Sequence, residues 1–356
     1  MSDIDLKKIS ILIPSLDPDI NMVNYINELV SNDVRNIIVI NDGSKKENFH
    51  FFEDVAKHSE VTVINHEVNK GKGRALKTGI EYIINNLKDV VGIVTADADG
   101  QHSCKDTIKV AQRLLETNDI IFGTRNFNED IVPFKSRNGN KITTIVFKLL
   151  YGETINDTQT GLRGLPIDFA KECLNIKGER YEYEIAMLIK AVVDNRKIIE
   201  EPIDTIYLND NRASHFNAFR DSFKIYRVMF KQLLTYSASS LFTSLIDLII
   251  YAILINTIFD DPKYLSGIMW STIIARIVSC TINYILNKKT VFKSDKNVGS
   301  TLIKYTVLAV VQMFASGYFT TLLYSLLKIN TTIIKVIVDF ILFFVSYHIQ
   351  KRWVFK

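Results

Sequence analysis

The chain has 356 residues but only three cysteines, Cys104, Cys173 and Cys280. They are widely spaced and none has the paired spacing of a zinc ligand set, so neither a disulfide framework nor a zinc site is expected. Residues 1–5 are polar and acidic and lack the cationic flank and apolar core of a secretory signal, so none is expected. These absences favour a protein whose thiols face a reducing cytosol.

Glutamate is absent from the last third of the chain. From Phe216 to Lys356 the sequence carries 16 lysines and arginines against 6 aspartates, a net charge of +10. Residues 1–215 carry 27 basic and 33 acidic side chains, a net charge of −6. The overall charge of +4 therefore conceals an acidic half joined to a basic half.

Four long apolar runs lie in the basic half. Each is near the ~20 residues that span a hydrocarbon core of ~30 Å, which predicts membrane helices at about 236–259, 265–286, 305–327 and 331–349. The connection 287–300 and the segment 351–356 are rich in Lys and Arg, whereas the other two connections are not. The positive-inside rule then places the N-terminal half and the C-terminus in the cytoplasm. A buried all-helical core is the alternative, and the charge asymmetry disfavours it.

The charged side chains Asp247, Arg276 and Asp339 fall inside these apolar runs. An ionised group at that depth is costly unless it is paired or hydrated. We therefore predict that Arg276 pairs with Asp247, with Asp339 or with both. The alternative is that each side chain reaches the headgroups.

Residues 216–234, just before the first run, place basic and aromatic side chains on neighbouring helical faces. This pattern is typical of an amphipathic helix that lies in the membrane interface. Packing of the apolar stripe against a soluble domain is the alternative. The predicted organisation is a soluble domain over 1–215, an interfacial helix over 216–234 and a membrane domain over 235–356.

Short apolar runs alternate with helical patterns in residues 1–215. Strands are predicted at 9–13, 36–40, 61–64 and 90–94, with helices at about 20–30, 47–57 and 73–86. This βαβ series predicts an α/β fold with a Rossmann-like, mostly parallel sheet and with ligands at the carboxyl ends of its strands. Polar residues follow these strands at Pro14-Ser15, at Asn41-Asp42-Gly43-Ser44 and at Asp97 to His102.

Asp97-Ala98-Asp99-Gly100-Gln101-His102 is the most informative motif. Two carboxylates one residue apart repel each other, and a divalent cation beside a phosphate-bearing substrate would relieve that repulsion. A solvated turn is the alternative, but it suits one Asp better than two. Asn41-Asp42-Gly43-Ser44 either offers a carboxylate to a nucleoside or is turn chemistry alone. Asn69-Lys70-Gly71-Lys72-Gly73 is either a phosphate loop without P-loop spacing or a solvated basic turn.

These motifs, in this order, resemble family-2 glycosyltransferases with a GT-A fold. The resemblance is to the branch of dolichol-phosphate mannose synthase and bacterial polyprenyl-phosphate glycosyltransferases. It covers most of residues 9–216 and extends through Gly123-Thr124-Arg125, Asp157 to Arg163, Tyr181 to Glu184 and Asn211 to Phe216. The membrane half is similar to the GtrA-like family, through Asn283 to Lys288 and Gln350 to Phe355.

The resemblance implies inverting transfer of a hexose from a nucleotide sugar to membrane polyprenyl phosphate, for cell-envelope or surface glycans. A UDP-sugar is the favoured donor and GDP-mannose is the other candidate. Mg²⁺ or Mn²⁺ is the implied cofactor. A homo-oligomer is left open, and no nucleic-acid partner is expected.

The resemblance also assigns roles to particular side chains. The implied catalytic residues are Asp99, Arg125, Arg163 and Glu184. The implied contacts to the nucleotide sugar are Pro14, Asp42, Lys72, Asp97 and Asp99, and the implied metal ligands are Asp99, Asp97 and Gln101. The implied contacts to the lipid phosphate are Arg125, Arg137, Arg163, Arg212, Ser214 and His215. For Glu184 two roles stay open, because it either orients an Arg or the sugar hydroxyls, or is a structural acid.

Two other functions compete with this interpretation. A flippase of lipid-linked sugars, or a membrane-anchored protein that only binds nucleotide sugars, needs no catalytic centre, and the intact Asp97, Asp99 and Gln101 argue against it. A processive polysaccharide synthase would carry Gln-x-x-Arg-Trp near its acceptor channel. Here Gln350-Lys351-Arg352-Trp353 is one residue short and follows the last span, so that match is rejected.

Overall fold

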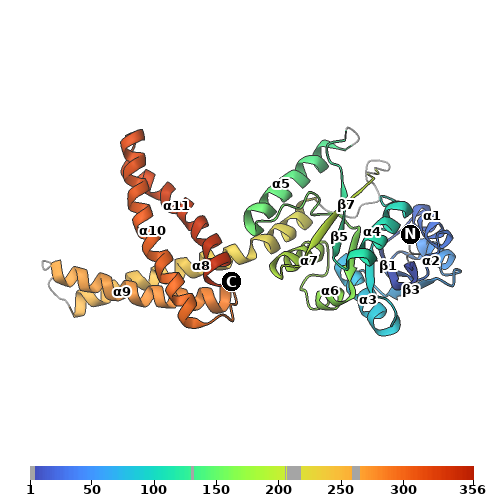
Figure 1. Cartoon of the computed structure of the whole chain (residues 1–356), viewed down its shortest axis with the longest axis horizontal. Coiled ribbons are helices and arrows are strands. Elements are labelled where there is room, and N and C mark those ends of the chain that lie inside the picture. The colour runs from blue at the N-terminus through green and yellow to red at the C-terminus, as the bar shows by residue number, and fades with distance from the viewer. Residues whose placement is uncertain (1–4, 130–131, 205, 207–217, 259–264) are drawn as a thin grey trace. The chain divides into compact units, whose positions relative to one another are not determined.

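A computed structural model describes residues 5–129, 132–204, 206, 218–258 and 265–356 (Figure 1). The chain divides into two compact units, residues 1–229 and residues 230–356. The first unit is an α/β domain and the second is helical throughout its described elements. The predicted α/β domain and the predicted helical domain are therefore both present in the chain.

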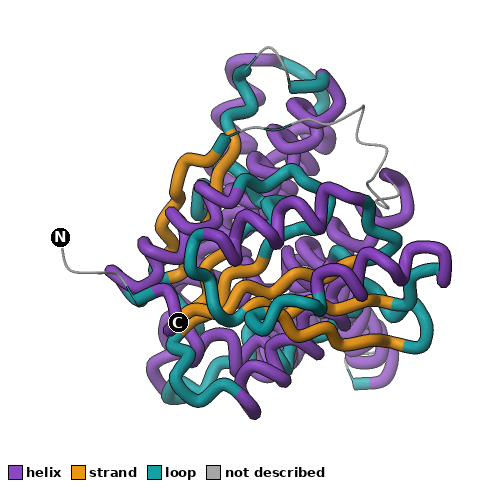
Figure 2. Tube along the Cα trace, turned by 90° about the vertical axis from the view of Figure 1, so that its right-hand side faces the viewer, coloured by secondary structure: helices purple, strands orange, loops and turns teal. Residues whose placement is uncertain are grey.

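A seven-stranded sheet forms the centre of the first unit, with the order β3-β2-β1-β4-β6-β5-β7. Its strands are β1 Ile9–Ser15, β2 Ile37–Asp42, β3 Val61–His66, β4 Gly92–Thr95, β5 Ile120–Arg125, β6 Arg163–Pro166 and β7 Ile198–Ile203. Only β6 runs antiparallel to its neighbours, and the other pairings are parallel. Figure 2 shows the strands, in orange, as one twisted layer. The predicted mostly parallel sheet is confirmed.

The helices of this unit follow the strands in the predicted alternation. They are α1 Ile20–Ser31, α2 Phe49–Val55, α3 Lys72–Asn86, α4 Cys104–Thr117, α5 Phe134–Tyr151, α6 Ile167–Cys173 and α7 Glu182–Val193. Central strand β1 is buried along its whole length, as expected for a strand covered on both faces. Its neighbours β2 and β4 run parallel to it, so the carboxyl ends of all three strands meet at one edge of the sheet.

Four long helices make up the membrane region: α8 Ala218–Thr257, α9 Leu265–Leu286, α10 Val298–Leu327 and α11 Thr331–Ile349. All four are long and apolar enough to cross a membrane. Helix α8 runs without a break through position 234, so the described part of the predicted interfacial helix and the first span form one helix. Two short π-helical turns, η4 Asn287–Val291 and η5 Gln350–Val354, end α9 and α11.

The two π-helical turns are alike in sequence and in geometry. One reads Asn-Lys-Lys-Thr-Val-Phe from Asn287 to Phe292, and the other reads Gln-Lys-Arg-Trp-Val-Phe from Gln350 to Phe355. Phe292 N donates to Asn287 O at 2.8 Å, and Phe355 N donates to Gln350 O at 3.0 Å. The same local structure therefore recurs at the end of each helical hairpin.

The turns also contact each other through equivalent residues. Asn287 Nδ2 donates to Gln350 Oε1 at 3.0 Å, and the rings of Phe292 and Phe355 stack with centroids 5.1 Å apart. The ring centroids of Tyr284 and Phe355 lie 5.9 Å apart, and those of the equivalent pair Tyr347 and Phe292 lie 6.0 Å apart. Each tyrosine thus contacts the phenylalanine of the other turn. An approximate two-fold axis between the hairpins α8–α9 and α10–α11 would produce such reciprocal contacts.

The charged side chains within the spans find partners inside their own hairpins. Arg276 on α9 lies 3.3 Å from Asp247 on α8, which confirms the predicted pair. Asp339 pairs with Lys335, one helical turn earlier on α11, at 3.0 Å. Asp339 also accepts from Ser316 of α10. The sequence analysis overlooked Lys335, which lies close enough to Asp339 along α11 to neutralise it without Arg276.

Candidate active site

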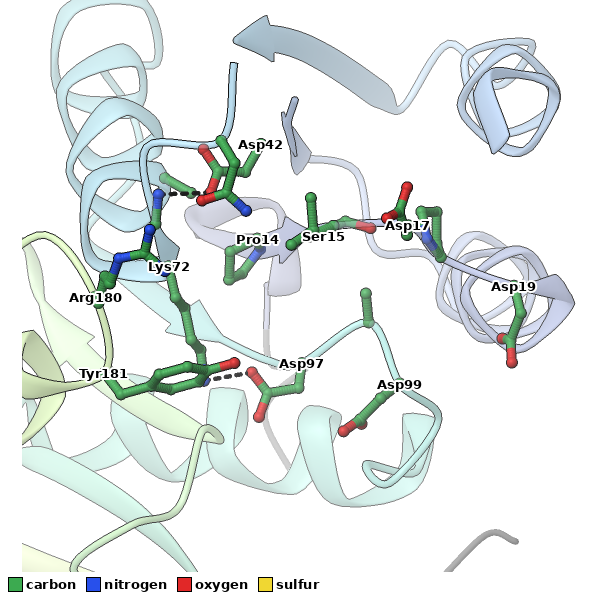
Figure 3. Close-up of a pocket in the computed structure, with 16 residues that line it drawn as sticks. Pro14, Ser15, Asp17, Asp19, Asp42, Lys72, Asp97, Asp99, Arg180 and Tyr181 are labelled. Atoms are coloured by element: carbon green, nitrogen blue, oxygen red, sulfur yellow. Dashed lines mark hydrogen bonds and ion pairs between the residues drawn. The ribbon is translucent and has the colours of Figure 1, made fainter. Parts of the chain in front are cut away.

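A pocket opens at the carboxyl ends of β1, β2 and β4, where the α/β fold predicts a ligand (Figure 3). The loop before α3 and the segment before α7 complete its wall. The lining residues are Pro14, Ser15, Leu16, Asp17, Pro18, Asp19, Asp42, Asn69, Gly71, Lys72, Ala75, Asp97, Ala98, Asp99, Arg180 and Tyr181. All five side chains implied as nucleotide-sugar contacts lie in this one wall, which brings together motifs from four parts of the chain.

Lys72, at the first position of α3, is held between two carboxylates. Its Nζ lies 2.6 Å from Asp97 Oδ1 and 3.0 Å from Glu184 Oε1. The side chains of Lys72 and Glu184 are only 17% and 10% exposed. Burial alone would lower the pKa of Lys72, but the two carboxylates outweigh it and hold that pKa above its ordinary value. Lys72 is therefore a charged ammonium that links α3, the end of β4 and α7.

Asp97 is fixed from two further sides. Burial alone would raise its pKa, but the ammonium of Lys72 outweighs it and holds the pKa well below its ordinary value. A Cβ added to Gly161 would lie 2.2 Å from Asp97 Oδ2, so only glycine permits this close approach. His102 Nε2 lies 3.6 Å from Asp97 Oδ2, and neither ring nitrogen of this buried histidine has a hydrogen-bond partner within the described residues. Asp97 thus faces the pocket from a tightly packed position.

Asp99 differs from Asp97 because no cation pairs with it in the described part of the chain. Its Oδ1 accepts a hydrogen bond from the main-chain N of Gln101 at 3.1 Å. Burial raises the pKa of Asp99 above its ordinary value, and the charge of Asp97 raises it further. A divalent cation would offset both effects.

The donor set fits such a cation by its chemistry. Asp97, Asp99 and Gln101 offer carboxylate and amide oxygens, which are ligands for hard cations such as Mg²⁺ and Mn²⁺. Over the residues that the structure describes, no three His, Cys, Asp or Glu side chains form a metal-binding group. Phosphate oxygens and water would have to complete the coordination, as Mg²⁺ commonly requires in nucleotide sites.

Asp42, at the end of β2, uses its carboxylate to hold the neighbouring loop. Its Oδ1 accepts from His66 Nδ1 at 2.7 Å and from Lys70 N at 2.9 Å, and its Oδ2 accepts from Gly71 N at 2.7 Å. Gly71 has a φ of +101°, a conformation that strongly favours glycine. Asp42 therefore positions the loop that leads into Lys72, in addition to lining the pocket.

Of the arginines implied as phosphate ligands, Arg125, Arg137 and Arg163 are among the described residues, and none of these three lines the pocket. Arg125, at the end of β5, donates to both carboxylate oxygens of Asp157, at 2.7 and 3.1 Å. Arg137 on α5 donates to Glu129 O at 2.7 Å. Arg212, Ser214 and His215 lie outside the described residues. The lipid-phosphate set thus stays a prediction.

Arg163 occupies a place that the sequence did not suggest. It is fully buried, and it donates to the main-chain oxygens of Thr160 at 2.8 Å and Glu184 at 2.6 Å. Its guanidinium also lies 4.6 Å from the centroid of the Phe122 ring. In this structure Arg163 joins the segment before β6 to α7, and its donors are directed at the protein instead of the pocket.

Two lining residues, Arg180 and Tyr181, were not predicted. Tyr181 lies beside the Lys72 ammonium, with 5.9 Å between Nζ and the ring centroid. Burial raises the pKa of its phenol to about 12. Tyr181 is the first residue of the stretch Tyr181 to Glu184 that carries the family resemblance, and Arg180 directly precedes it. This position was the only signal for a site role of either residue in the sequence.

Comparison with known proteins supports the same division of the chain. Residues 10–172 match glycosyl transferase family 2, and residues 235–355 match the GtrA/DPMS transmembrane domain. The chain is 31% identical over 242 residues to a UDP-N-acetylglucosamine–dolichyl-phosphate N-acetylglucosaminyltransferase of Methanococcus voltae, covering 62% of this chain and 94% of that protein. The chain belongs to glycosyl transferase family 2.

Two other relatives match this glycosyltransferase over different shares of their own length. An uncharacterized protein of Methanocaldococcus jannaschii is 29% identical over 236 residues, covering 65% of this chain and 93% of that protein. A dolichyl-phosphate beta-glucosyltransferase of Trichomonas vaginalis is 27% identical over 181 residues, covering 47% of this chain and 53% of that protein. The protein is therefore a family-2 glycosyltransferase with a C-terminal membrane region.

The contact between Gly161 and Asp97 predicts the effect of one methyl group. Gly161→Ala should lower the transferase activity about 100-fold, because the new Cβ must push the Asp97 carboxylate out of position. Gly139→Ala on α5 is the matched control, since its Cβ would meet nothing within 4 Å. The control should keep its activity and should not lose thermal stability. Initial rates and melting temperatures of both variants check this, and an active Gly161→Ala enzyme would refute the packing argument.

Proposed function

We propose that this glycosyltransferase transfers a hexose from a nucleotide sugar, with a UDP-sugar favoured over GDP-mannose, to polyprenyl phosphate in the membrane. One observation carries the proposal: the relative matched over 94% of its length is named for a UDP-sugar donor and a dolichyl-phosphate acceptor. The pocket at the strand ends suits a soluble donor, and the GtrA/DPMS region supplies a membrane surface for a lipid acceptor. By the positive-inside rule, the pocket and the C-terminus are proposed to face the cytoplasm.

The proposed reaction is a single displacement with inversion. An oxygen of the lipid phosphate attacks C1 of the hexose on the face opposite the diphosphate. The new C1–O bond forms as the bond from C1 to the diphosphate oxygen breaks, and its electron pair leaves with the nucleoside diphosphate. A phosphate monoester has a second pKa of about 6, so the acceptor is largely a dianion at neutral pH and needs no dedicated base.

In this scheme the wall of the pocket orients the donor. Pro14 and Asp42 would contact the nucleoside, while Lys72 holds the Asp97 and Glu184 carboxylates in place. Asp99, Asp97 and Gln101 would hold Mg²⁺ or Mn²⁺, which would neutralise charge that develops on the leaving diphosphate. The acceptor phosphate would meet Arg125 and Arg137, together with Arg212, Ser214 and His215.

Metal dependence gives the first test. Removal of divalent cations by a chelator should abolish transfer, and added Mg²⁺ or Mn²⁺ should restore it. Asp99→Ala should lower the rate about 100-fold or more and should remove the effect of Mg²⁺ on nucleotide affinity. Asp89→Ala, an exposed carboxylate before β4, is the control and should behave as the wild type. Full activity of Asp99→Ala at limiting Mg²⁺ would exclude Asp99 as a ligand.

The substrates give the second test. Purified full-length protein in detergent is incubated with polyprenyl phosphate, Mg²⁺ and, in separate reactions, UDP-glucose, UDP-N-acetylglucosamine, UDP-galactose or GDP-mannose. Mass spectrometry should find a glycolipid with one phosphate for one of these donors, and NMR should show the anomer opposite to that of the donor. If nucleotide binds but no donor yields a glycolipid, the chain is a binding protein or a flippase.

A further inference from the structure

The charges around the pocket do not balance. Among its lining residues in the described part of the chain are five carboxylates but only two cationic side chains, Lys72 and Arg180. The charge of Lys72 is already offset by Asp97 and Glu184, at 2.6 and 3.0 Å. An anionic ligand that enters this pocket therefore gains little from Lys72. Of the described lining residues, Arg180 is the cation that remains to meet it.

Arg180 is free to bind a ligand. Its side chain is exposed, and its guanidinium makes no hydrogen bond or ion pair with the residues that the structure describes. Its main chain, in contrast, is fixed, because Arg180 N donates to Glu182 Oε1 and Arg180 O accepts from Tyr183 N at 3.1 Å. Because the backbone is fixed, a ligand that binds the guanidinium has to order the side chain alone.

The turn that carries Arg180 is anchored to α3. Arg74 on α3 forms two hydrogen bonds to the carboxylate of Glu179, at 2.6 and 2.7 Å, and Lys77 donates to Gly178 O at 2.8 Å. A Cβ on Gly71 would lie 2.7 Å from Arg180 Cγ, so Arg180 packs directly on the residue before α3. Figure 3 shows Arg180 and Lys72 on the same side of the pocket.

The N-terminus of α3 adds to the positive field at this place. Gly71 is the N-cap of this 15-residue helix, and no side chain caps it. In the first turn, Arg74 N already donates to Glu179 O at 3.0 Å. The N–H groups of a helix's first turn carry a partial positive charge and attract anions, phosphate above all. Arg180 thus places a planar fork of donors beside main-chain groups that favour the same ligand.

We propose that Arg180 binds the diphosphate of the nucleotide sugar, with Lys72 acting as the internal countercharge of Asp97 and Glu184. This inference rests on the proposed function and names the side chain that recognises the donor's most charged group. It also changes the role of Lys72, which the family resemblance gave as a contact to the nucleotide sugar. A guanidinium can bind two phosphate oxygens at once, so Arg180 also favours a diphosphate over a monophosphate.

Binding of free nucleotides tests the proposal without the chemical step. Calorimetry measures the affinities of full-length wild type, Arg180→Ala and Arg180→Lys for UDP and UMP with Mg²⁺, with GDP and GMP as the second series. Arg180→Ala should weaken diphosphate binding about tenfold or more and monophosphate binding about twofold or less. Arg180→Lys should fall between, because it keeps the charge but not the fork.

Lys177→Ala is the matched control. Lys177 is an exposed cation three residues earlier, and it does not line the pocket. The Lys177→Ala variant should bind the diphosphates and the monophosphates as the wild type does. This result would distinguish a direct contact of Arg180 from an effect of the segment's overall charge. All variants should share the melting temperature of the wild type.

Three results would overturn the proposal. Unchanged diphosphate affinity in Arg180→Ala excludes the contact, and equal weakening of diphosphate and monophosphate excludes the proposed specificity. A raised KM for polyprenyl phosphate with unchanged UDP and GDP binding would place Arg180 at the acceptor. Each of these leaves the proposed function standing. If the wild type binds neither UDP nor GDP, the donor half of the proposed function fails together with this inference.

Discussion

The ion pairs of Lys72 with Asp97 and Glu184 are the interaction on which the site depends, at distances of 2.6 and 3.0 Å. They join the start of α3, the end of β4 and the start of α7, which are far apart in the sequence. Removal of one partner from such a buried set leaves an uncompensated charge, at a cost of about 3–5 kcal/mol. The same contacts that fix these elements therefore hold the Asp97 carboxylate at the pocket.

The surrounding structure serves to hold this triad. Asp42 fixes the loop that ends at Gly71, so that Lys72 enters α3 in the right place. Gly161 lets a neighbouring segment close against Asp97, and Arg163 joins that segment to the main chain of Glu184. Since Lys72 is thus occupied, an unpaired cation for the donor has to come from elsewhere. Asp99, which no side-chain cation pairs within the described residues, is the first candidate ligand for the proposed metal ion.

The sequence predicted what short-range patterns determine. Apolar periodicity located the strands β1 to β4 and the four long helices, and local motifs located most of the pocket wall. Contacts between distant segments were out of reach: the partners of Lys72, the burial of Arg163 and the approach of Arg180 to Gly71 arise only when α3, β6 and α7 pack together. The unbroken α8 was missed because an amphipathic and an apolar segment look different while sharing one helical backbone.

The central claim is that Lys72 is an internal countercharge, and a double-mutant cycle on Lys72 and Glu184 tests it most directly. Unfolding free energies are compared for wild type, Lys72→Met, Glu184→Gln and the double variant. We expect Lys72→Met to be strongly destabilised and Glu184→Gln in that background to recover part of the loss, with a coupling energy above about 1 kcal/mol. Additive effects, or a stable Lys72→Met whose only defect is weaker diphosphate binding, would contradict the central claim.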